Sequence, residues 1–396
     1  GSYTFRLDAR HGDPQSPERS IDLRQFLQRS FAIYDGFDAD ELVCSRLEQS
    51  DYAALYFDLS TKARCRSIAV IGNSQALPLS RCLEAILQSK SVKVRSWVHA
   101  HVLQSSEQAR DELTELFEDS GTVFLQPDIW RALQPTFSRF EKKVLLFPAV
   151  NFDAFHPDLV HVFGGSNGEI VRGPLANYHS SIALLGWRAG LDVDETVKLY
   201  NKATYEQLGF FDYLESARKN ILAQGREADL ELGGCLRRWM GQGCFMHSVE
   251  HPKIFVMADI ARLLAQKMGA CSTDENSTMD LHDPLAESVV WPVYPELGPA
   301  LGTHGSYRFK TEFWEPESGQ QVPVLDLREL VTQLHEVYES LGKQPLVCKR
   351  LDQASYQTLL GQLRTEKKNR ASADEARVAN ARPHILRGSQ SIKMTV

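Results

Sequence analysis

One serine of this chain follows a short hydrophobic segment in a pattern that can position a nucleophile. Residues 68–71 are apolar and rich in β-branched side chains, and Gly72, Asn73, Ser74 and Gln75 follow them. A strand that ends in a tight glycine turn at a helix start points a side chain, backbone N–H groups and the positive helix end into one space. Ser74 could therefore act as a nucleophile beside an oxyanion site. An ordinary strand–helix turn with a capping serine has the same pattern.

Three later segments concentrate histidine with amide or carboxylate side chains at the ends of expected strands or helices. They span residues 147–158, 173–180 and 245–253. His156, Asp158 and His179 come from the first two segments, and we expect them to line a pocket beside Ser74. Each histidine could instead be a satisfied core or capping residue. The convergence of three such segments is what favours a site.

His251 is the strongest candidate for a general base. It precedes Pro252, which predicts that a helix begins there. The positive end of that helix would disfavour the imidazolium form and keep a neutral base available. Beside Ser74 it would form a serine–histidine pair, with Glu250 or Asp158 orienting the ring. A histidine that merely caps a surface helix is the alternative.

The elements that must hold these residues alternate between strands and helices. Strand-length apolar runs lie at 68–71, 92–98, 122–125, 144–147 and 159–163, and helical patterns lie at 76–88 and 105–118. This order predicts an α/β fold with a small, doubly wound, Rossmann-like parallel sheet. From residue 173 to 269 the pattern is that of a helical subdomain, with helices expected at 178–189, from Asp192 to 202, and from 252 to 268.

An internal repeat flanks this region. Gly-Ser-Tyr-Thr-Phe at residues 1–5 recurs as Gly-Ser-Tyr-Arg-Phe at 305–309, an offset of 304 residues (305 minus 1). The same offset relates residues 22–24 to 326–328, residues 42–47 to 346–351, and Tyr52 to Tyr356. We therefore expect duplicated α+β modules that pack on the core or against each other. The predicted domains are a first module at 1–66, a core at 67–269, a linker and extension at 270–304, a second module at 305–366 and a polar tail at 367–396. Within the linker, residues 270–283 are expected to be polar and exposed.

Composition narrows the class of protein. With 43% hydrophobic and 24% charged residues, the 396-residue chain is typical of a globular protein with more than one domain. A net charge of −7 gives no electrostatic footprint for nucleic acid, and no apolar run approaches the roughly 20 residues of a membrane helix. Seven scattered cysteines without a CxxC pair favour neither a disulfide framework nor a zinc site. We expect a cytoplasmic protein without a bound metal.

Taken in order, the motifs resemble the WcbI family of polysaccharide biosynthesis enzymes. They are Gly72-Asn73-Ser74-Gln75, Leu125-Gln126-Pro127, Phe147-Pro148 with His156-Pro157-Asp158, Tyr178-His179-Ser180, and Phe245-Met246-His247 leading to His251-Pro252-Lys253. The resemblance covers about residues 67–269, roughly half of the chain. The family motif commonly has cysteine at the position of Ser74, and a hydroxyl needs a stronger base than a thiol.

The resemblance implies an O-acetyltransferase that uses coenzyme A or acetyl-CoA and modifies a capsular or exported bacterial polysaccharide. Ser74 would be the nucleophile or a polariser and His251 the base, with direct transfer and a covalent intermediate both open. Asn73, Gln75 and backbone N–H groups would stabilise the oxyanion. The residues expected to contact coenzyme A are Lys253, Gln126, Arg172 and Lys310. Expected partners are a sugar or polysaccharide acceptor, other polysaccharide-synthesis enzymes, or further copies of the chain.

Two other functions are compatible with the residues. An SGNH-like carbohydrate esterase or deacetylase would use water in place of the acceptor, and the Gly-Asn-Ser turn with a late Ser-x-x-His is similar to such enzymes. A non-catalytic glycan-binding or assembly protein would instead rely on the repeated modules. Coenzyme A dependence separates the transferase from the esterase, and the effect of replacing Ser74 separates both from the assembly protein.

Overall fold

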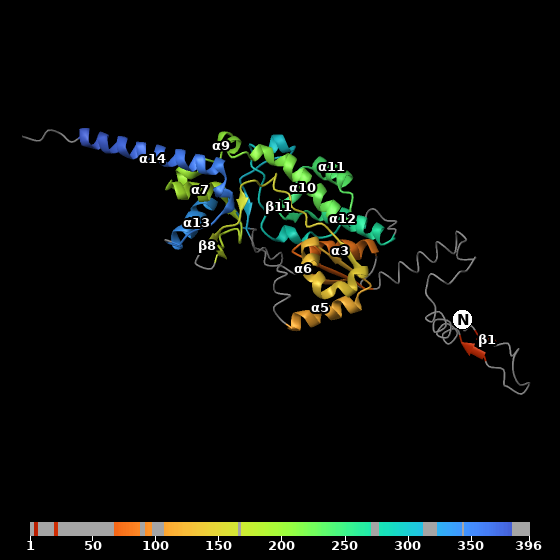
Figure 1. Cartoon of the computed structure of the whole chain (residues 1–396). Coiled ribbons are helices and arrows are strands. Elements are labelled where there is room, and N and C mark those ends of the chain that lie inside the picture. The colour runs from red at the N-terminus through yellow and green to blue at the C-terminus, as the bar shows by residue number, and fades with distance from the viewer. Residues whose placement is uncertain are drawn as a thin grey trace, which may run out of the picture. The chain divides into compact units, whose positions relative to one another are not determined.

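The computed structural model of this protein describes residues 4–6, 20–22, 67–87, 92–96, 107–164, 168–270, 277–311, 323–342 and 344–381. The chain divides into two compact units, Gly1–Lys62 and Ala63–Val396. Figure 1 shows the elements of each unit. The larger unit contains the family-like region and the second copy of the repeat, and the candidate site lies within it.

The larger unit contains a four-stranded, fully parallel sheet. Its strands are β3 (Ile68–Gly72), β4 (Val92–Ser96), β5 (Thr122–Leu125) and β6 (Val144–Leu146), in the order β4-β3-β5-β6. These strands confirm the first four of the five predicted apolar runs and the mixed α/β class. The fifth prediction is wrong for this sheet, because β7 (Leu159–Val160) pairs antiparallel with β10 (His179–Ser180). A Rossmann or SGNH topology stays a prediction.

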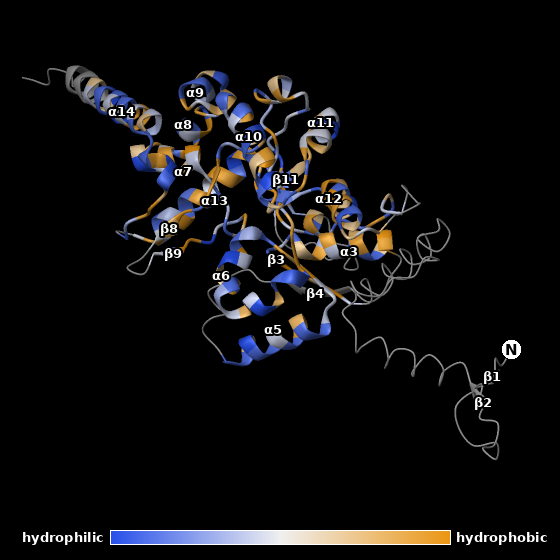
Figure 2. Cartoon of the chain, turned by 45° about the vertical axis from the view of Figure 1, so that its right-hand side comes forward, coloured by the Kyte–Doolittle hydropathy of each residue, from blue (hydrophilic) through white to orange (hydrophobic). Residues whose placement is uncertain are grey.

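Helices cover both faces of the sheet because successive strand residues point to opposite sides. In β3, Ile68 and Val70 belong to one hydrophobic cluster and Ala69 and Ile71 to another. The first cluster includes α3 (Ala76–Leu87) and α12 (Ile254–Lys267), which pack together. The second includes α5 (Glu107–Asp119) and α6 (Pro127–Phe137). Figure 2 shows more hydrophobic residues along α3 and α12 than along α5.

The predicted helical subdomain is present, with one correction at its end. Its helices are α7 (Ser181–Ala189), α8 (Val193–Val197), α9 (Lys202–Gln207), α10 (Tyr213–Glu227) and α11 (Gly233–Gly241), followed by α12. The capping box of Asp192 and Glu195 is confirmed at the start of α8. The predicted helix start at His251 is wrong: β12 (His251–Pro252) pairs with β11 (Met246–Ser248), and α12 begins at Ile254. Pairing with a preceding strand holds His251 in extended backbone.

The remaining described elements are short, apart from two C-terminal helices. The short ones are β8 (Phe163–Gly164), β9 (Glu169–Ile170), β13 (Phe309–Lys310), β14 (Val324–Leu325), η2 (Ser138–Lys143), η3 (Phe210–Asp212), η4 (Pro284–Glu287), η5 (Gly298–Leu301) and η7 (Lys349–Asp352). The two long helices are α13 (Leu327–Ser340) and α14 (Ala354–Ala381). The predicted polar tail is thus helical to Ala381, and its last 15 positions, 382–396, lie outside the described residues. No described helix is long and apolar enough to cross a membrane.

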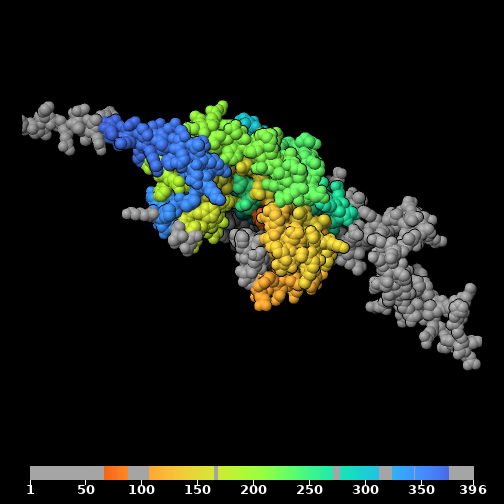
Figure 3. Space-filling view, in the orientation of Figure 1, coloured from red at the N-terminus to blue at the C-terminus, as the bar shows by residue number. Residues whose placement is uncertain are grey.

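Described residues between 277 and 366 (277–311, 323–342 and 344–366) pack into the body of the larger unit. Trp291 and Tyr294, from the expected extension, are buried, and Leu330 and Tyr338 of α13 belong to the same hydrophobic cluster as β3. The extension and the second copy of the repeat therefore share one core with the sheet. In Figure 3 the C-terminal residues (blue) cover residues near 200 (yellow-green), in agreement with the packing of α13 and α14 on α7 and α8.

The described strands of the repeat share one register. In the second copy Phe309 pairs with Leu325 and Lys310 with Val324. In the first copy β1 (Thr4–Arg6) pairs with β2 (Ser20–Asp22), with Phe5 opposite Ile21 and Arg6 opposite Ser20. Each pairing is displaced by 304 residues, the offset found in the sequence. The rest of the first copy lies outside the described residues.

Candidate functional site

The turn after β3 is held by a pair of amide side chains. The Asn73 backbone N–H donates to Gln126 Oε1 (2.9 Å), and Gln126 Nε2 donates back to Asn73 Oδ1 (3.0 Å). Gln126 is buried, so this predicted coenzyme A contact joins the ends of β3 and β5. A Cβ on Gly72 would lie only 2.7 Å from the ring of Phe147, so this position requires glycine.

Gln75 connects three segments that are far apart in the sequence. Its Nε2 donates to the carbonyl oxygens of Val150 (3.0 Å) and Glu250 (2.8 Å), and the Val150 N–H donates to its Oε1 (2.9 Å). The side chain is fully buried. Gln75, predicted to stabilise an oxyanion, thus gives its amide hydrogens to the backbone. Ser74 precedes Gln75 in the chain, and His251 follows Glu250. The hydrogen bond between Gln75 and Glu250 therefore holds the Ser74 turn next to the segment before His251.

Ser74 lies between these anchors at the start of α3. It is half-buried, and its hydroxyl forms no hydrogen bond within the described part of the chain. The Ala76 N–H donates to the Asn73 carbonyl (2.9 Å), which closes the turn. The side chain is thus positioned by its neighbours while its oxygen stays available.

His251 is buried in surroundings that favour its neutral imidazole. Burial lowers the pKa of its imidazole, and the neighbouring Glu250 carboxylate partly opposes that shift. Its Nδ1 has no hydrogen-bond partner in the described ranges, and its ring meets that of Tyr178 edge-on with centroids 6.2 Å apart. Glu250 accepts from the Tyr178 hydroxyl (3.0 Å). Glu250 therefore positions Tyr178, and a carboxylate that orients the His251 imidazole stays a prediction.

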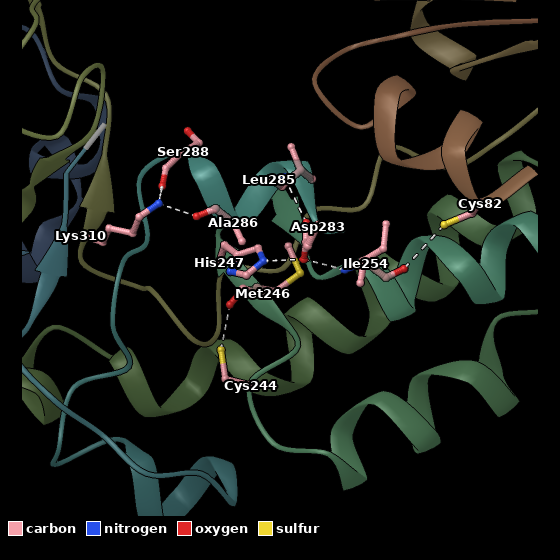
Figure 4. Close-up of polar contacts among 10 residues, drawn as sticks. All are labelled: Cys82, Cys244, Met246, His247, Ile254, Asp283, Leu285, Ala286, Ser288 and Lys310. Atoms are coloured by element: carbon pink, nitrogen blue, oxygen red, sulfur yellow. Dashed lines mark hydrogen bonds and ion pairs between the residues drawn. The ribbon is translucent and has the colours of Figure 1, made fainter. Parts of the chain in front are cut away.

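A histidine–aspartate pair that the sequence did not reveal lies next to His251. Asp283 Oδ2 accepts from His247 Nε2 (2.8 Å) and from the Ile254 N–H (2.9 Å), so it also caps α12 (Figure 4). Burial alone would raise the pKa of Asp283, but the hydrogen bond and charge of His247 lower it below its usual range. The Asp283-Pro284 step was the available signal, since it is typical of a cap, but its partner helix begins 29 residues earlier.

Asp158, predicted to line the pocket, is enclosed in a separate polar cluster at the start of α7. Its carboxylate is fully buried and accepts four hydrogen bonds, from the hydroxyls of Ser180 (2.5 Å), Ser181 (2.7 Å) and Tyr294 (2.6 Å) and the N–H of Ile182 (2.9 Å). Tyr200 and Tyr356 hydrogen-bond to the two serines. Burial raises the pKa of Asp158, and the hydroxyl donors oppose the rise.

The other two predicted histidines are also enclosed. His179 Nε2 hydrogen-bonds to the Val171 carbonyl (2.9 Å) and Nδ1 to the Tyr338 hydroxyl (3.0 Å). Burial lowers its pKa to about 4. Burial likewise lowers the pKa of His156 to about 3, although backbone carbonyls of Pro292 and Met246 favour the charged form. Both therefore stay neutral at physiological pH, within the core.

The predicted cationic residues differ in their surroundings. Lys310 Nζ donates to the carbonyl oxygens of Ala286 and Ser288 (Figure 4), and burial lowers its pKa. Arg172 is exposed. Lys253 is half-buried at the N-cap of α12, next to His251. Lys253 is therefore the one of the three that lies beside the Ser74–His251 region.

An open cleft of about 530 Å³ lies between α11 and α12 and is lined by Arg237, Arg238 and Arg262. Arg238 and Arg262 both bind Asp259, whereas Arg237 is exposed and forms no hydrogen bond or ion pair within the described residues. Gly233 and Gly234 line the same cleft at the start of α11. Sequence analysis did not select these residues, because no phosphate-loop spacing accompanies them. In the described ranges, no cluster of His, Cys, Asp or Glu could hold a metal ion.

Comparison with known families agrees with this arrangement. Residues 67–273, just over half of the chain, match the family model described as polysaccharide biosynthesis enzyme WcbI. No curated protein and no solved structure matches the chain. The α/β domain with its serine turn is thus that of a polysaccharide biosynthesis enzyme. The chain belongs to the WcbI family, which confirms the resemblance seen in its motifs.

Proposed function

We propose that the protein transfers an acetyl group from acetyl-CoA to a hydroxyl of a sugar or polysaccharide precursor. The observation that carries this proposal is a half-buried serine hydroxyl whose turn is tied to the segment before His251, a buried histidine with an unpaired ring nitrogen. The Ser74 hydroxyl and His251 Nδ1 lack hydrogen-bond partners within the described residues, and Gln75 ties their segments together. Unpaired buried polar groups are costly, so they are retained where a substrate pairs with them.

The residues divide the chemical work between them. His251, kept neutral by burial, accepts the proton of the attacking hydroxyl and returns it to the leaving group. The hydroxyl that attacks is that of Ser74 or that of the acceptor, with Ser74 donating a hydrogen bond in the second route. Backbone N–H groups at the start of α3 stabilise negative charge on the carbonyl oxygen. Acetyl-CoA supplies the activated acyl group.

The cleft between α11 and α12 fits a polyanionic co-substrate. Arg237 offers an uncompensated guanidinium there, and guanidinium groups bind phosphates through paired N–H donors. Arg262 lies eight residues along α12 from Ile254, about 12 Å at 1.5 Å per residue. We assign the phosphates to this cleft and to Lys253, which lies between it and His251 in the sequence.

Thermal unfolding with millimolar coenzyme A or acetyl-CoA tests this assignment. Ligand at 100 times its dissociation constant stabilises the folded state by about 2.7 kcal/mol, which gives a clear upward shift. The Arg237→Ala variant should lose most of the shift, and Arg110→Ala, an exposed arginine of α5, should retain it. The absence of a shift with either ligand would contradict the proposal. Hydrolysis of acyl esters without coenzyme A would instead identify an esterase.

A further inference from the structure

The second copy of the repeat is locked onto the family core by four polar side chains. Tyr307 hydrogen-bonds to the Tyr205 hydroxyl (2.6 Å), Tyr338 to His179 Nδ1 (3.0 Å), Arg350 to the Pro157 carbonyl (2.7 Å), and Tyr356 to the Ser181 hydroxyl (2.8 Å). All four partners lie within residues 67–273, the range of the family match. The core therefore provides the surface on which the second copy of the repeat docks.

Apolar residues of the second copy complete this contact. Phe309, Cys348 and Leu351 are almost fully buried in the hydrophobic cluster that contains the core helices. Two other residues of the second copy, Glu336 of α13 and Lys349, are exposed. The second copy thus has a docking side and a solvent side that can be told apart residue by residue.

The first copy retains the docking side. At the constant offset of 304, the positions of the four polar contacts are Tyr3, Tyr34, Arg46 and Tyr52, identical in type to the second copy. Three buried apolar positions are also identical, as Phe5, Cys44 and Leu47, whereas the buried positions of α13, Leu330, Val331 and Leu334, correspond to Phe26, Leu27 and Ser30. Some exposed positions have changed, such as Lys349 to Ser45 and Glu336 to Ala32, and others are retained, such as Arg328 as Arg24. Together with the shared register of β1–β2 and β13–β14, this pattern preserves what the core recognises.

We propose that residues 1–62 are a docking element for a second core of the WcbI fold. The core of this chain has one set of partner groups, Tyr205, His179, the Pro157 carbonyl and Ser181, and the second copy already uses all of them. The first copy forms a compact unit separate from residues 63–396. Its partner is therefore another α/β core that presents tyrosine, histidine and serine in the same arrangement. This inference does not depend on the acetyl-transfer proposal.

A graft in the full chain tests whether the first copy can dock. Residues 305–356 are replaced by the sequence of residues 1–52, and unfolding is followed by tryptophan fluorescence. We expect one cooperative transition near the wild-type midpoint. Alanine at the grafted position of Arg46 should lower that midpoint as much as Arg350→Ala does in the wild-type chain. Alanine at the grafted position of Ser45 should have no effect, as for Lys349→Ala.

The first graft could fail to fold only because it changes the volumes of buried side chains in α13. A smaller graft leaves α13 unchanged. It replaces residues 346–356 alone with residues 42–52, which carry the arginine and the last tyrosine. Loss of the cooperative transition in this smaller graft would overturn the proposal. Insensitivity of either graft to alanine at the arginine would overturn it too.

Sedimentation velocity tests docking between chains. The acceptor is the full chain with Arg46→Ala, Tyr52→Ala, Arg350→Ala and Tyr356→Ala, which weakens both of its own copies. Mixed with the wild-type chain, it should form a one-to-one complex. The complex should vanish when the donor carries Arg46→Ala and Tyr52→Ala, and persist with Asp35→Ala, which corresponds to the exposed Glu339. No complex, or one that survives the Arg46 and Tyr52 changes, would count against a second core as partner.

Discussion

Two groups of polar side chains in this protein were both expected at its pocket, yet their hydrogen bonding differs. At the start of α7 the carboxylate of Asp158 accepts four hydrogen bonds, and His179 uses both ring nitrogens. The half-buried Ser74 hydroxyl before α3 and the buried His251 Nδ1 in β12 have no partner within the described residues. The first cluster is closed and the second is open.

This difference in hydrogen bonding predicts that one group of residues stabilises the fold and that the other takes part in the reaction. A saturated network gains nothing from a substrate, and removing one member leaves other buried groups unpaired. A buried atom without a partner, such as His251 Nδ1, costs stability until a substrate pairs with it. Changes in the Asp158 cluster should therefore act on folding, and changes in the Ser74 cluster should act on turnover.

The largest expected effect is that of Asp158→Ala. It leaves three hydroxyls and one N–H without their acceptor in the core, and we expect a loss of about 3 kcal/mol or more in the free energy of unfolding. Urea unfolding measures it, with exposed Asp352→Ala as the control. A variant of unchanged stability but lost activity would place Asp158 in the chemistry and would erase the comparison.

Ser74→Ala should have the opposite profile. Since the hydroxyl makes no internal hydrogen bond in the described structure, we expect unfolding to change by no more than about 0.5 kcal/mol. Acetyl transfer to a sugar acceptor should fall about 100-fold or more. Steady-state assays of free coenzyme A release check this. Full activity in Ser74→Ala would leave His251 as the only candidate at this edge.

Stability should fall as the pH is lowered from 6.5 to 4. His156 and His179 have folded pKa values of about 3 and about 4, whereas unfolded histidine titrates near 6.5. In that window the unfolded state binds more protons, so protonation favours unfolding by about 1 kcal/mol per histidine between pH 6.5 and 5.5. Urea titrations across this range measure the slope. His179→Gln should reduce it and exposed His282→Gln should not; equal slopes would show that His179 is not the cause.

Asp283→Ala tests whether a residue close to His251 affects both stability and turnover. It removes the cap of α12 and the partner of His247, and we expect a loss of about 1–2 kcal/mol. Because the Asp283 charge opposes the lowering of the His251 pKa, the acid limb of the pH–rate profile should also move to lower pH. Asp280→Ala, exposed and three residues away, is the matched control. An unmoved acid limb would exclude an electrostatic link between Asp283 and the base.

Local pattern predicted the parts of the fold that local sequence controls. The helix expected at 76–88 is observed at Ala76–Leu87, and the strand before Ser74 is buried at every apolar position. The helix start at His251 failed because a strand pairing with Met246 overrides the preference of proline for a first helical turn. The proline is visible in the sequence itself, whereas no alternation of polar and apolar residues indicates the pairing with the strand at Met246.

The candidate site was predictable only in part for the same reason. Ser74 and His251 stand out by residue type and by neighbouring glycine and proline, which a sequence displays. The hydrogen-bond partners of Asp158, His179 and Ser181 include Tyr294, Tyr338 and Tyr356 respectively, each more than 130 residues later. No spacing rule connects residues so far apart, so their enclosure became apparent only in three dimensions.

The amide of Gln75 has a consequence for how the protein is made. The turn that holds Ser74 acquires its shape through bonds to Val150 and Glu250, 75 and 175 residues further along the chain. During synthesis the serine therefore leaves the ribosome long before the groups that fix it. Such long loops are closed late, because their entropy must be lost before any contact is gained. Catalytic competence is thus among the last properties that a nascent chain acquires, and a truncated chain ending before residue 250 would lack it.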